Sequence, residues 1–330
     1  MANSKDKSGM SQVTYEFPYM KPQDKFSLGK FLYNSENGTI MSRTPKDWEI
    51  VLVIKERNGK LLIFYAIFYT VLAALFAICL QGLFYTITKE YPKWQMERSL
   101  IGTNPGVGFR PISEDTTQGS LIWFKASDPD SIRPWTKLLD DYLAPYQNKS
   151  LLPGGGKNQE MCDFDSPPKP GRVCAVEVSK WEHCNAENDY GYSKSSPCIF
   201  VKLNRIFNWV PDFYDDVNDL PDDMPEELKS HIAQLDASKR KQVWISCRGE
   251  HPSDREAIGP IKYIPSHGMA SYYYPFTNIP GYLSPIIAVH LERPALNRLI
   301  NIECRAWAKN IQYQGGRDRS GSVHLELMID

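Results

Sequence analysis

The chain has 330 residues and is nearly neutral, with 38 Lys and Arg against 39 Asp and Glu. The first 60 residues carry ten basic and seven acidic side chains, a net of +3, so the remainder carries −4. Neither part has the basic excess of a nucleic-acid-binding protein, and no nucleic-acid partner is expected. Residues 88–330 are enough chain to build a proper hydrophobic core.

The N-terminal segment is polar. Residues 1–48 contain scattered Gly, Pro and Asn without a sustained hydrophobic period, which is typical of a disordered or membrane-surface tail. The apolar run Ile50–Ile54 is too short to span a bilayer, so we expect it to lie in the interface or to pair as a strand. Residues 1–60 are therefore predicted to form a tail on one side of a membrane.

An uncharged apolar run, Leu61–Ile87, follows this tail. A helix of that length reaches roughly 40 Å, while the hydrocarbon core of a bilayer is about 30 Å thick. A cleaved signal peptide is excluded because its apolar stretch would be shorter, closer to the N-terminus and followed by a small-residue cleavage site. The run predicts one transmembrane signal-anchor helix at 61–87.

Cysteine usage orients this helix. Cys79 lies within the span, none precedes it, and an even set of six follows, as expected of disulfides in an oxidising compartment. A glycosylation sequon at Asn148 lies on the same side, whereas the sequon at Asn37 lies in the tail and should stay unmodified. The chain is therefore predicted to be a single-pass type II membrane protein with a cytoplasmic N-terminus. The six external cysteines are Cys162, Cys174, Cys184, Cys198, Cys247 and Cys304.

Beyond the membrane, residues 88–118 contain turn signals and are expected to form an extended extracellular stalk. A helix is predicted next, with Asp130 or Ser131 as its cap and Pro145 as its end. A second helix is predicted at 225–238, where apolar residues share one face.

The C-terminal half is dominated by alternating apolar and polar residues. Period-two patterns separated by turn residues predict half-buried strands, and several of them suggest a β-sandwich over residues 119–330. Cys247 and Cys304 fall on the apolar faces of their strands, so both should point into one core, and a bridge between facing sheets is the natural arrangement. The alternating segments are 243–247, 287–291, 300–306 and 323–329.

Motifs that would indicate catalysis are incomplete. The run Gly154–Lys157 fails as a phosphate loop because position 151 is Leu and position 158 is Asn. Eight acids in 212–227 lack the spacing of a calcium loop and are expected to form a solvated surface. Asp128-Pro129-Asp130 has the letters of a glycosyltransferase metal motif, but it precedes a helix in a β-rich region. The sequence predicts no enzyme activity, no metal and no cofactor.

One face of the apolar run carries a stripe of aromatic and small residues. Tyr65, Tyr69 and Ala73 follow helical spacing, and Gln81 lies near the outer end. Membrane helices associate by close packing and hydrogen bonds, for which these side chains are suited. An aromatic belt at the headgroups, with a glutamine reaching the surface, explains the same residues equally well.

These features together make the chain similar to the beta subunits of the sodium pump, the Na,K-ATPase, and of its relative the proton–potassium pump. The resemblance runs from about residue 30 to the C-terminus and depends on the order of its pieces. In the tail and span the pieces are Lys30–Asn34, Arg43-Thr44, Trp48, Phe64-Tyr65-x-x-Phe68-Tyr69-x-x-Leu72-Ala73-x-x-Phe76 and Gln81. Beyond the span they are Tyr190–Tyr192, Pro197-Cys198, Lys202–Arg205 and Tyr273–Pro275.

The resemblance implies a non-catalytic, glycosylated subunit that pairs with a catalytic alpha subunit in the plasma membrane. It implies that Tyr65, Phe68 and Tyr69 face a helix of this partner, with Gln81 on the same span. It also implies that Tyr273, Tyr274 and Pro275 meet one of the partner's extracellular loops. Membrane lipid and a small single-span regulatory subunit are further partners that it implies.

The resemblance also implies a fold: an immunoglobulin-like sandwich with inserted helices, attached to one transmembrane helix. The implied disulfide order is sequential, Cys162–Cys174, Cys184–Cys198 and Cys247–Cys304. The chain departs from the family in the interval 49–60, where the family usually has only a few residues between Trp48 and the membrane. A stand-alone cell-adhesion glycoprotein with the same fold is the alternative function.

Overall fold

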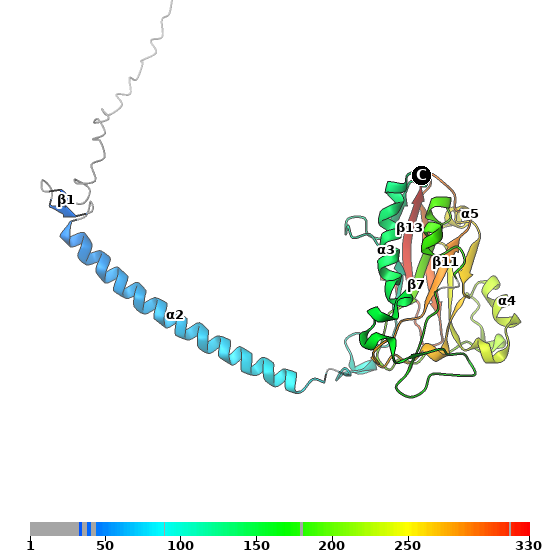
Figure 1. Cartoon of the computed structure of the whole chain (residues 1–330), viewed down its shortest axis with the longest axis horizontal. Helices are drawn as coiled ribbons and strands as arrows, with labels where there is room; N and C mark the ends of the chain where they lie inside the picture. Colours follow the sequence, from blue (N-terminus) through cyan, green and yellow to red (C-terminus); the bar gives the residue numbers. More distant parts are fainter. Residues whose placement is uncertain (1–32, 35–37, 41–43, 89, 179–180, 317) are drawn as a thin grey trace, which may run out of the picture. The chain divides into compact units, whose positions relative to one another are not determined.

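The computed structural model describes residues 33–34, 38–40, 44–88, 90–178, 181–316 and 318–330 (Figure 1). It divides into two compact units, residues 1–86 and 87–330. In the first unit the short strands β1 (Tyr33–Asn34) and β2 (Thr39–Ile40) pair antiparallel. A single long helix, α2 (Pro45–Tyr85), follows them.

Helix α2 begins earlier than the sequence pattern indicates. The run Ile50–Ile54, expected at the interface or in a strand, is helical, and so is the whole interval 49–60. An ion pair between Glu56 and Lys60, 2.8 Å apart and one turn along, supports this polar part of the helix. The interval therefore extends the apolar helix rather than separating it from the tail.

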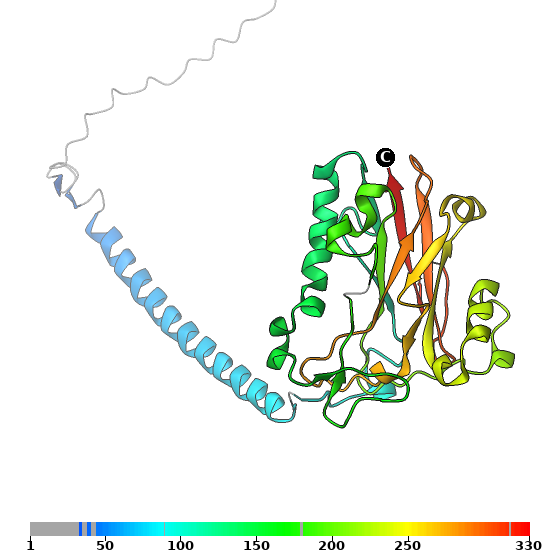
Figure 2. The same ribbon diagram turned by 45° about the vertical axis from the view of Figure 1, so that its right-hand side comes forward.

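The second unit is built on two sheets, which are antiparallel apart from one pair of strands (Figure 2). The larger sheet has the order β10-β8-β12-β13-β4, and the smaller has the order β3-β7-β11-β9. Only the β13–β4 pair in the larger sheet is parallel. The strands of the larger sheet are β10 (Gly268–Ala270), β8 (Gln242–Gly249), β12 (Ile300–Trp307), β13 (Ser322–Ile329) and β4 (Leu121–Phe124). Those of the smaller are β3 (Val107–Arg110), β7 (Cys198–Leu203), β11 (Ile286–Leu291) and β9 (Ile261–Ile264).

Three helices lie outside the sheets. In Figure 2 the long α3 (Pro129–Gln147) and the short α4 (Glu226–Gln234) flank the strands on opposite sides. The third is α5 (Pro252–Ala257), and a small parallel pair is formed by β5 (Gln159–Glu160) and β6 (Val173–Cys174). The 3₁₀ turns are η1 (Met96–Arg98), η2 (Lys149–Leu151), η3 (Pro153–Gly156), η4 (Ala186–Lys194), η5 (Val217–Asp219), η6 (Ala237–Arg240) and η7 (Ser271–Tyr273).

One hydrophobic core joins both sheets. Val243 and Ile302 from the larger sheet and Val201 and Ile287 from the smaller are buried in the same cluster. The apolar positions predicted to be buried in β8 and β12 are buried, and those in β13 are buried or partly buried, but only β13 is half-buried along its length. Trp244 of β8 and Trp307 of β12 are buried as well, in a second cluster on the opposite face. All six residues of β11 are buried, so this strand is covered on both faces rather than half-buried.

The predicted boundaries differ from the structure in three places. The stalk expected at 88–118 is too long, because β3 within it pairs with β7 in the smaller sheet. The N-cap of α3 is Asp128, whose carboxylate accepts a hydrogen bond of 3.0 Å from the backbone N–H of Asp130. Pro145 lies inside α3 rather than at its end, where the Tyr146 hydroxyl donates to the Ser284 carbonyl at 3.0 Å and anchors the last turn.

The disulfide between Cys247 and Cys304 joins neighbouring strands of one sheet. The two residues are direct partners in the β8–β12 ladder, with Cα atoms 4.0 Å apart. The expectation of a bridge between facing sheets is therefore wrong. Alternation shows which face of a strand a side chain occupies, and side chains on one face can meet a strand beside them as well as a sheet opposite.

The eight acidic residues of segment 212–227 are all exposed, as predicted. Asp223 pairs with Arg305 on β12, and Asp219 pairs with Lys309 just after that strand. These ion pairs hold the segment against the larger sheet, beside a second core cluster of Met224, Leu228, Ile232, Trp244 and Trp307. The predicted solvated acidic surface is therefore confirmed, and two of its exposed carboxylates also form ion pairs with residues in or just after β12 of the larger sheet.

We predict that Cys247→Ser destabilises the second unit more than Cys162→Ser. The first bridge closes a loop of 57 residues in sequence separation and the second a loop of 12. Chain entropy alone gives about 4 and about 3 kcal/mol for these loops. Each change leaves a buried thiol unpaired, Cys304 in the first case and Cys174 in the second, so the loop length decides the order. Thermal unfolding of the purified variants measures which is less stable, and a lower unfolding midpoint for Cys162→Ser than for Cys247→Ser would contradict the prediction.

A half-buried histidine pair predicts a pH dependence of stability. The rings of His231 on α4 and His267 lie 4.6 Å apart, and neither His231 Nε2 nor His267 Nδ1 has a hydrogen-bond partner among the described residues. Burial, and then the charge of His231, lowers the pKa of His267 to about 4. Unfolded histidine has a pKa of about 6.5 and takes up the proton first, so the free energy of unfolding falls as pH drops from 6.5 to 4.

Denaturant unfolding at several pH values in this window measures how steeply the free energy of unfolding falls with pH. We expect a shallower pH dependence for the double variant His231→Gln, His267→Gln. The matched control is His251→Asn, at an exposed position where asparagine can still cap α5. A slope that is equally shallow in the control would assign the effect to other groups.

Candidate functional site

The surface of α2 is apolar and uncovered. Among the described residues, Glu56–Tyr85 is the one helical segment long and apolar enough to cross a membrane; it has 30 residues, and an 18-residue window within it has a mean hydropathy of 2.5. None of that window is buried by the described parts of the chain. Tyr65, Phe68 and Tyr69 are 45%, 49% and 60% exposed. Exposed apolar side chains on such a helix pack against lipid or against another helix.

The aromatic residues of α2 are arranged in rows. The rings of Tyr65 and Tyr69 lie nearly parallel, with centroids 6.1 Å apart, and those of Phe64 and Phe68 lie 6.3 Å apart. The two rows touch where Phe68 meets Tyr69 edge to face at 5.4 Å. The helix therefore presents a broad aromatic surface, and both tyrosine hydroxyls remain available to a neighbour. Gln81, farther along, is exposed as well.

The second predicted contact, Tyr273–Pro275, is mostly turned inward. The Tyr273 hydroxyl donates to the Ala175 carbonyl at 3.4 Å, and the Tyr274 hydroxyl donates to Met269 Sδ at 3.6 Å. Burial raises the pKa of both phenols far above the ordinary value. Of the three residues only Pro275 is exposed. The tyrosines thus anchor this segment to the domain, and Pro275 is the part of it that remains exposed.

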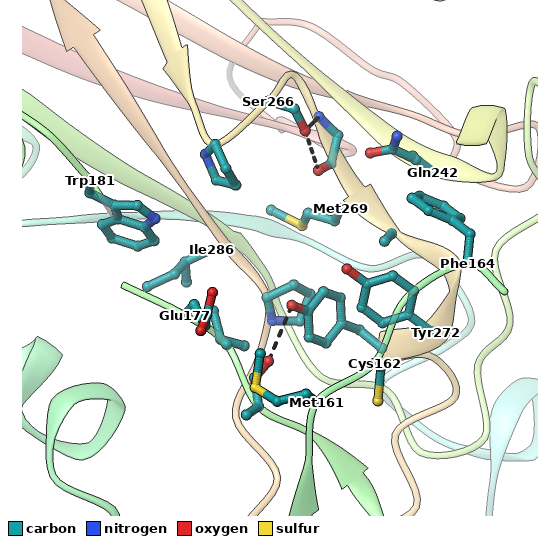
Figure 3. A pocket seen from close by; sticks show the side chains of 17 residues that line it. Met161, Cys162, Phe164, Glu177, Trp181, Gln242, Ser266, Met269, Tyr272 and Ile286 are labelled. Carbon is teal, nitrogen blue, oxygen red and sulfur yellow. Dashed lines mark hydrogen bonds between the residues drawn. The ribbon is translucent and has the colours of Figure 1, made fainter. Parts of the chain in front are cut away.

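A cavity of about 250 Å³ lies beside this segment (Figure 3). The rings of Tyr272 and Tyr273 lie 4.6 Å apart on one side of it, and Trp181, Met269 and Ile286 line it from the core. The indole nitrogen of Trp181 is buried without a hydrogen-bond partner in the part of the chain that the structure describes. Sequence patterns did not indicate this cavity, since its walls come from segments far apart in the chain.

The disulfides lie where they support these surfaces. Cys162–Cys174 ties β6 to the segment before it, one residue from the Ala175 carbonyl that accepts from Tyr273. Cys184–Cys198 ties the segment before η4 to the start of β7. Together with Cys247–Cys304 these bridges have the sequential order that the resemblance implies. Cys79 is free and exposed on α2.

The sequon at Asn148 is accessible. Asn148 is exposed at the end of α3, and its side-chain carbonyl accepts hydrogen bonds from the Ser150 backbone at 3.0 Å and hydroxyl at 2.7 Å. This turn leaves the asparagine amide facing outward. Asn37 lies outside the described residues.

The described residues show no arrangement suited to catalysis by a metal. Over these parts of the chain, no group of three or more His, Cys, Asp or Glu side chains could hold a metal ion. The glycine run that resembled a phosphate loop forms η3, where Gly154 and Gly155 have φ of +77° and +62°. Such left-handed turns require glycine for backbone reasons alone.

Comparison with known proteins identifies relatives along nearly the whole chain. The family model described as "Sodium / potassium ATPase beta chain" matches residues 20–325. The sodium/potassium-transporting ATPase subunit beta-2 of Drosophila melanogaster is 45% identical over 323 residues, which cover 97% of this chain and 96% of the relative. Subunit beta-1 of the same organism is 45% identical over 316 residues, covering 96% of both chains.

More distant relatives carry related names. The probable subunit beta-3 of Caenorhabditis briggsae is 33% identical over 305 residues, covering 91% of this chain and 86% of the relative. The similarity therefore includes the apolar helix α2, strands of both sheets and all six disulfide-bonded cysteines.

Proposed function

The chain belongs to the family of sodium/potassium ATPase beta chains, and from this we propose that it is the non-catalytic subunit of an ion-pumping complex. It pairs with the catalytic alpha subunit, helps it to fold and to reach the plasma membrane, and modulates its transport of Na⁺ and K⁺. The observation that carries the proposal is the aromatic surface of α2, whose side chains are not packed against any other described part of this chain.

The proposed topology is type II, with residues 1–60 cytoplasmic and the second unit outside. All three disulfides and the exposed Asn148 lie in this second unit, which suits an oxidising compartment. We propose an immunoglobulin-like sandwich for it, supported by two sheets that share one core and by helices inserted between strands.

On α2, the row of Tyr65 and Tyr69 is proposed to pack on a helix of the alpha subunit, with Phe68 beside it. Gln81 is proposed to hydrogen-bond within the same interface, because an amide in hydrocarbon favours a protein partner. Lipid and a small single-span regulatory subunit are proposed to cover the remaining circumference. On the second unit, Pro275 and the backbone around Tyr273 and Tyr274 are proposed to meet an extracellular loop.

Purification in mild detergent tests the function directly. A large ATPase should co-purify with the full chain and hydrolyse ATP in a Na⁺- and K⁺-dependent manner. Recovery of the chain alone, together with clustering of cells that display it, would favour the stand-alone adhesion protein instead.

We predict that Asn148 carries a glycan in cells. Treatment with a glycan-removing enzyme should increase gel mobility, and Asn148→Gln should abolish the shift. Asn37→Gln is the matched control and should leave the shift unchanged. A shift lost only with Asn37→Gln would reverse the proposed topology.

We predict a graded effect of changes on α2. Interhelical hydrogen bonds in membranes contribute about 0.6 kcal/mol on average, so Tyr65→Phe with Tyr69→Phe should weaken co-purification of the ATPase only modestly. Replacement of both by leucine should weaken it more, since ring packing is also lost. Tyr85→Leu is the control, because Tyr85 is 93% exposed at the end of the helix and outside the two rows. An equal loss in the control would favour a headgroup belt.

A further inference from the structure

Three cationic side chains gather beside the β3–β7 edge of the smaller sheet. Arg110 ends β3, Lys202 lies on β7, and Arg205 follows that strand. The Arg110 guanidinium and the Lys202 ammonium lie 5.6 and 5.9 Å from the centre of one ring, that of Tyr142 on α3. Two positive charges thus share a single aromatic surface.

The third cation is held by aromatic rings of its own. The Arg205 guanidinium lies 5.4 Å from the ring centre of Phe276 and 5.2 Å from that of Tyr282. The charge of Arg205 also acts on Lys202: burial, and then the charges of Arg110 and Arg205, lowers the pKa of the Lys202 ammonium. The three groups therefore form one electrostatic cluster, which we call the cationic cluster.

The cationic cluster has no counter-charge. No carboxylate of the described residues forms an ion pair with Arg110, Lys202 or Arg205. Other arginines of this unit do have acidic partners, among them Arg305 with Asp223 and Arg319 with Glu250 at 2.7 Å. Within the cluster Arg110 and Lys202 are half-buried and Arg205 is exposed. Like charges held close together and partly out of water disfavour each other, so a nearby anion would be stabilised.

Hydrogen-bond donors of the cluster also remain free. Arg110 Nη1 donates to the Phe109 carbonyl and Arg205 Nε donates to the Ser284 hydroxyl, both at 2.8 Å. Both acceptors are neutral, and a guanidinium has five N–H groups to donate. The Tyr142 hydroxyl is buried without a partner among the described residues. The cluster therefore combines positive charge with unused donors.

The rings restrict the motion of the cationic side chains before any ligand binds. Stacking on Tyr142, Phe276 and Tyr282 places the charged groups, so a ligand has less side-chain entropy to overcome. Guanidinium groups suit the planar or tetrahedral oxygens of carboxylate, sulfate and phosphate, and an ammonium adds a point charge.

We propose that Arg110, Lys202 and Arg205 form a binding site for an oxyanion, a carboxylate, sulfate or phosphate group. The group comes either from a free extracellular anion or from a carboxylate side chain carried by the catalytic subunit. The chemistry of recognition is the same for both sources. The site itself does not depend on the proposed function, because it is complete within this chain.

The test uses the full chain in detergent and sodium sulfate as the probe. Sulfate strengthens folding in general by exclusion from protein surfaces, so its effect is compared with sodium chloride at equal ionic strength and with variants. A specific site adds stabilisation that saturates with sulfate concentration. We expect a saturable rise of the unfolding midpoint in the wild type and its loss in the triple variant Arg110→Gln, Lys202→Gln, Arg205→Gln.

A matched control removes the same charge elsewhere. Arg133, Lys229 and Lys262 are cations with acidic partners at 3.0, 2.9 and 2.7 Å, and their triple glutamine variant should keep the sulfate response. If the cluster variant does not fold, Lys202→Met keeps the packing of the stem and removes the charge. It should raise the sulfate concentration for half-maximal response at least threefold.

The two sources are separated in the complex with the catalytic subunit. A free anion gives the saturable response in the complex as well as in the chain alone. A carried carboxylate fills the site, so sulfate has no added effect in the complex and the cluster variant co-purifies severalfold less ATPase than the control. The proposal is overturned if the cluster variant matches the control both in its sulfate response and in the amount of ATPase recovered. Failure to recover any ATPase with the wild type bears on the proposed function, while the chain-alone response still decides the site.

Discussion

The apolar surface of α2 is the constraint on which the rest of the molecule depends. Nearly every side chain of Glu56–Tyr85 is exposed among the described residues. Hydrocarbon or a second helix is the cover that such a surface needs. The second unit is compact by itself, which requires its own core and its own covalent constraints.

The second unit meets that requirement by linking its sheets and its turns. A single hydrophobic cluster includes residues from both sheets, so neither sheet has to be stable alone. The disulfides join different kinds of elements. Cys247–Cys304 links two neighbouring strands of one sheet, while the other two bridges fix the segment that precedes η4 and the segment that follows β5. The Tyr273 hydroxyl bonds to a carbonyl beside one of these bridges, so the segment ending in the exposed Pro275 is held by covalent and noncovalent contacts together.

Sequence patterns predicted which face of a helix or strand is buried better than they predicted which other element that face contacts. The alternation in β8, β12 and β13 correctly predicts which face of each strand joins the main core, because the face that a residue occupies is a local property. It did not show that Trp244 and Trp307 are buried on the opposite face. The same alternation could not tell whether Cys247 meets a facing sheet or an adjacent strand. The start of α2 at Pro45 was also missed, because an interval with charged residues such as Glu56 and Lys60 continues a helix without continuing its apolar run.

The candidate site shows the same division. The rows of rings on α2 follow from helical spacing and were visible in the sequence. The inward direction of Tyr273 and Tyr274 was not, because a run of aromatic residues is compatible with a core as well as with an interface. The cavity beside Trp181 and the cationic cluster each combine segments about a hundred residues apart, which no local pattern indicates.

Two groups of charged side chains on the second unit differ, because only one of them has partners of opposite charge among the described residues. On the side of α4, the acids of 212–227 find Arg305 and Lys309, and the ion pairs hold that segment on the sheet. Near α3, the cations at 110, 202 and 205 meet aromatic rings instead of carboxylates. Both arrangements keep charged groups in place, but only the first neutralises them. An unpaired cluster built on rigid strands is therefore better explained by a ligand outside the chain than by a need of the fold, for which neutral side chains on the same rings would suffice.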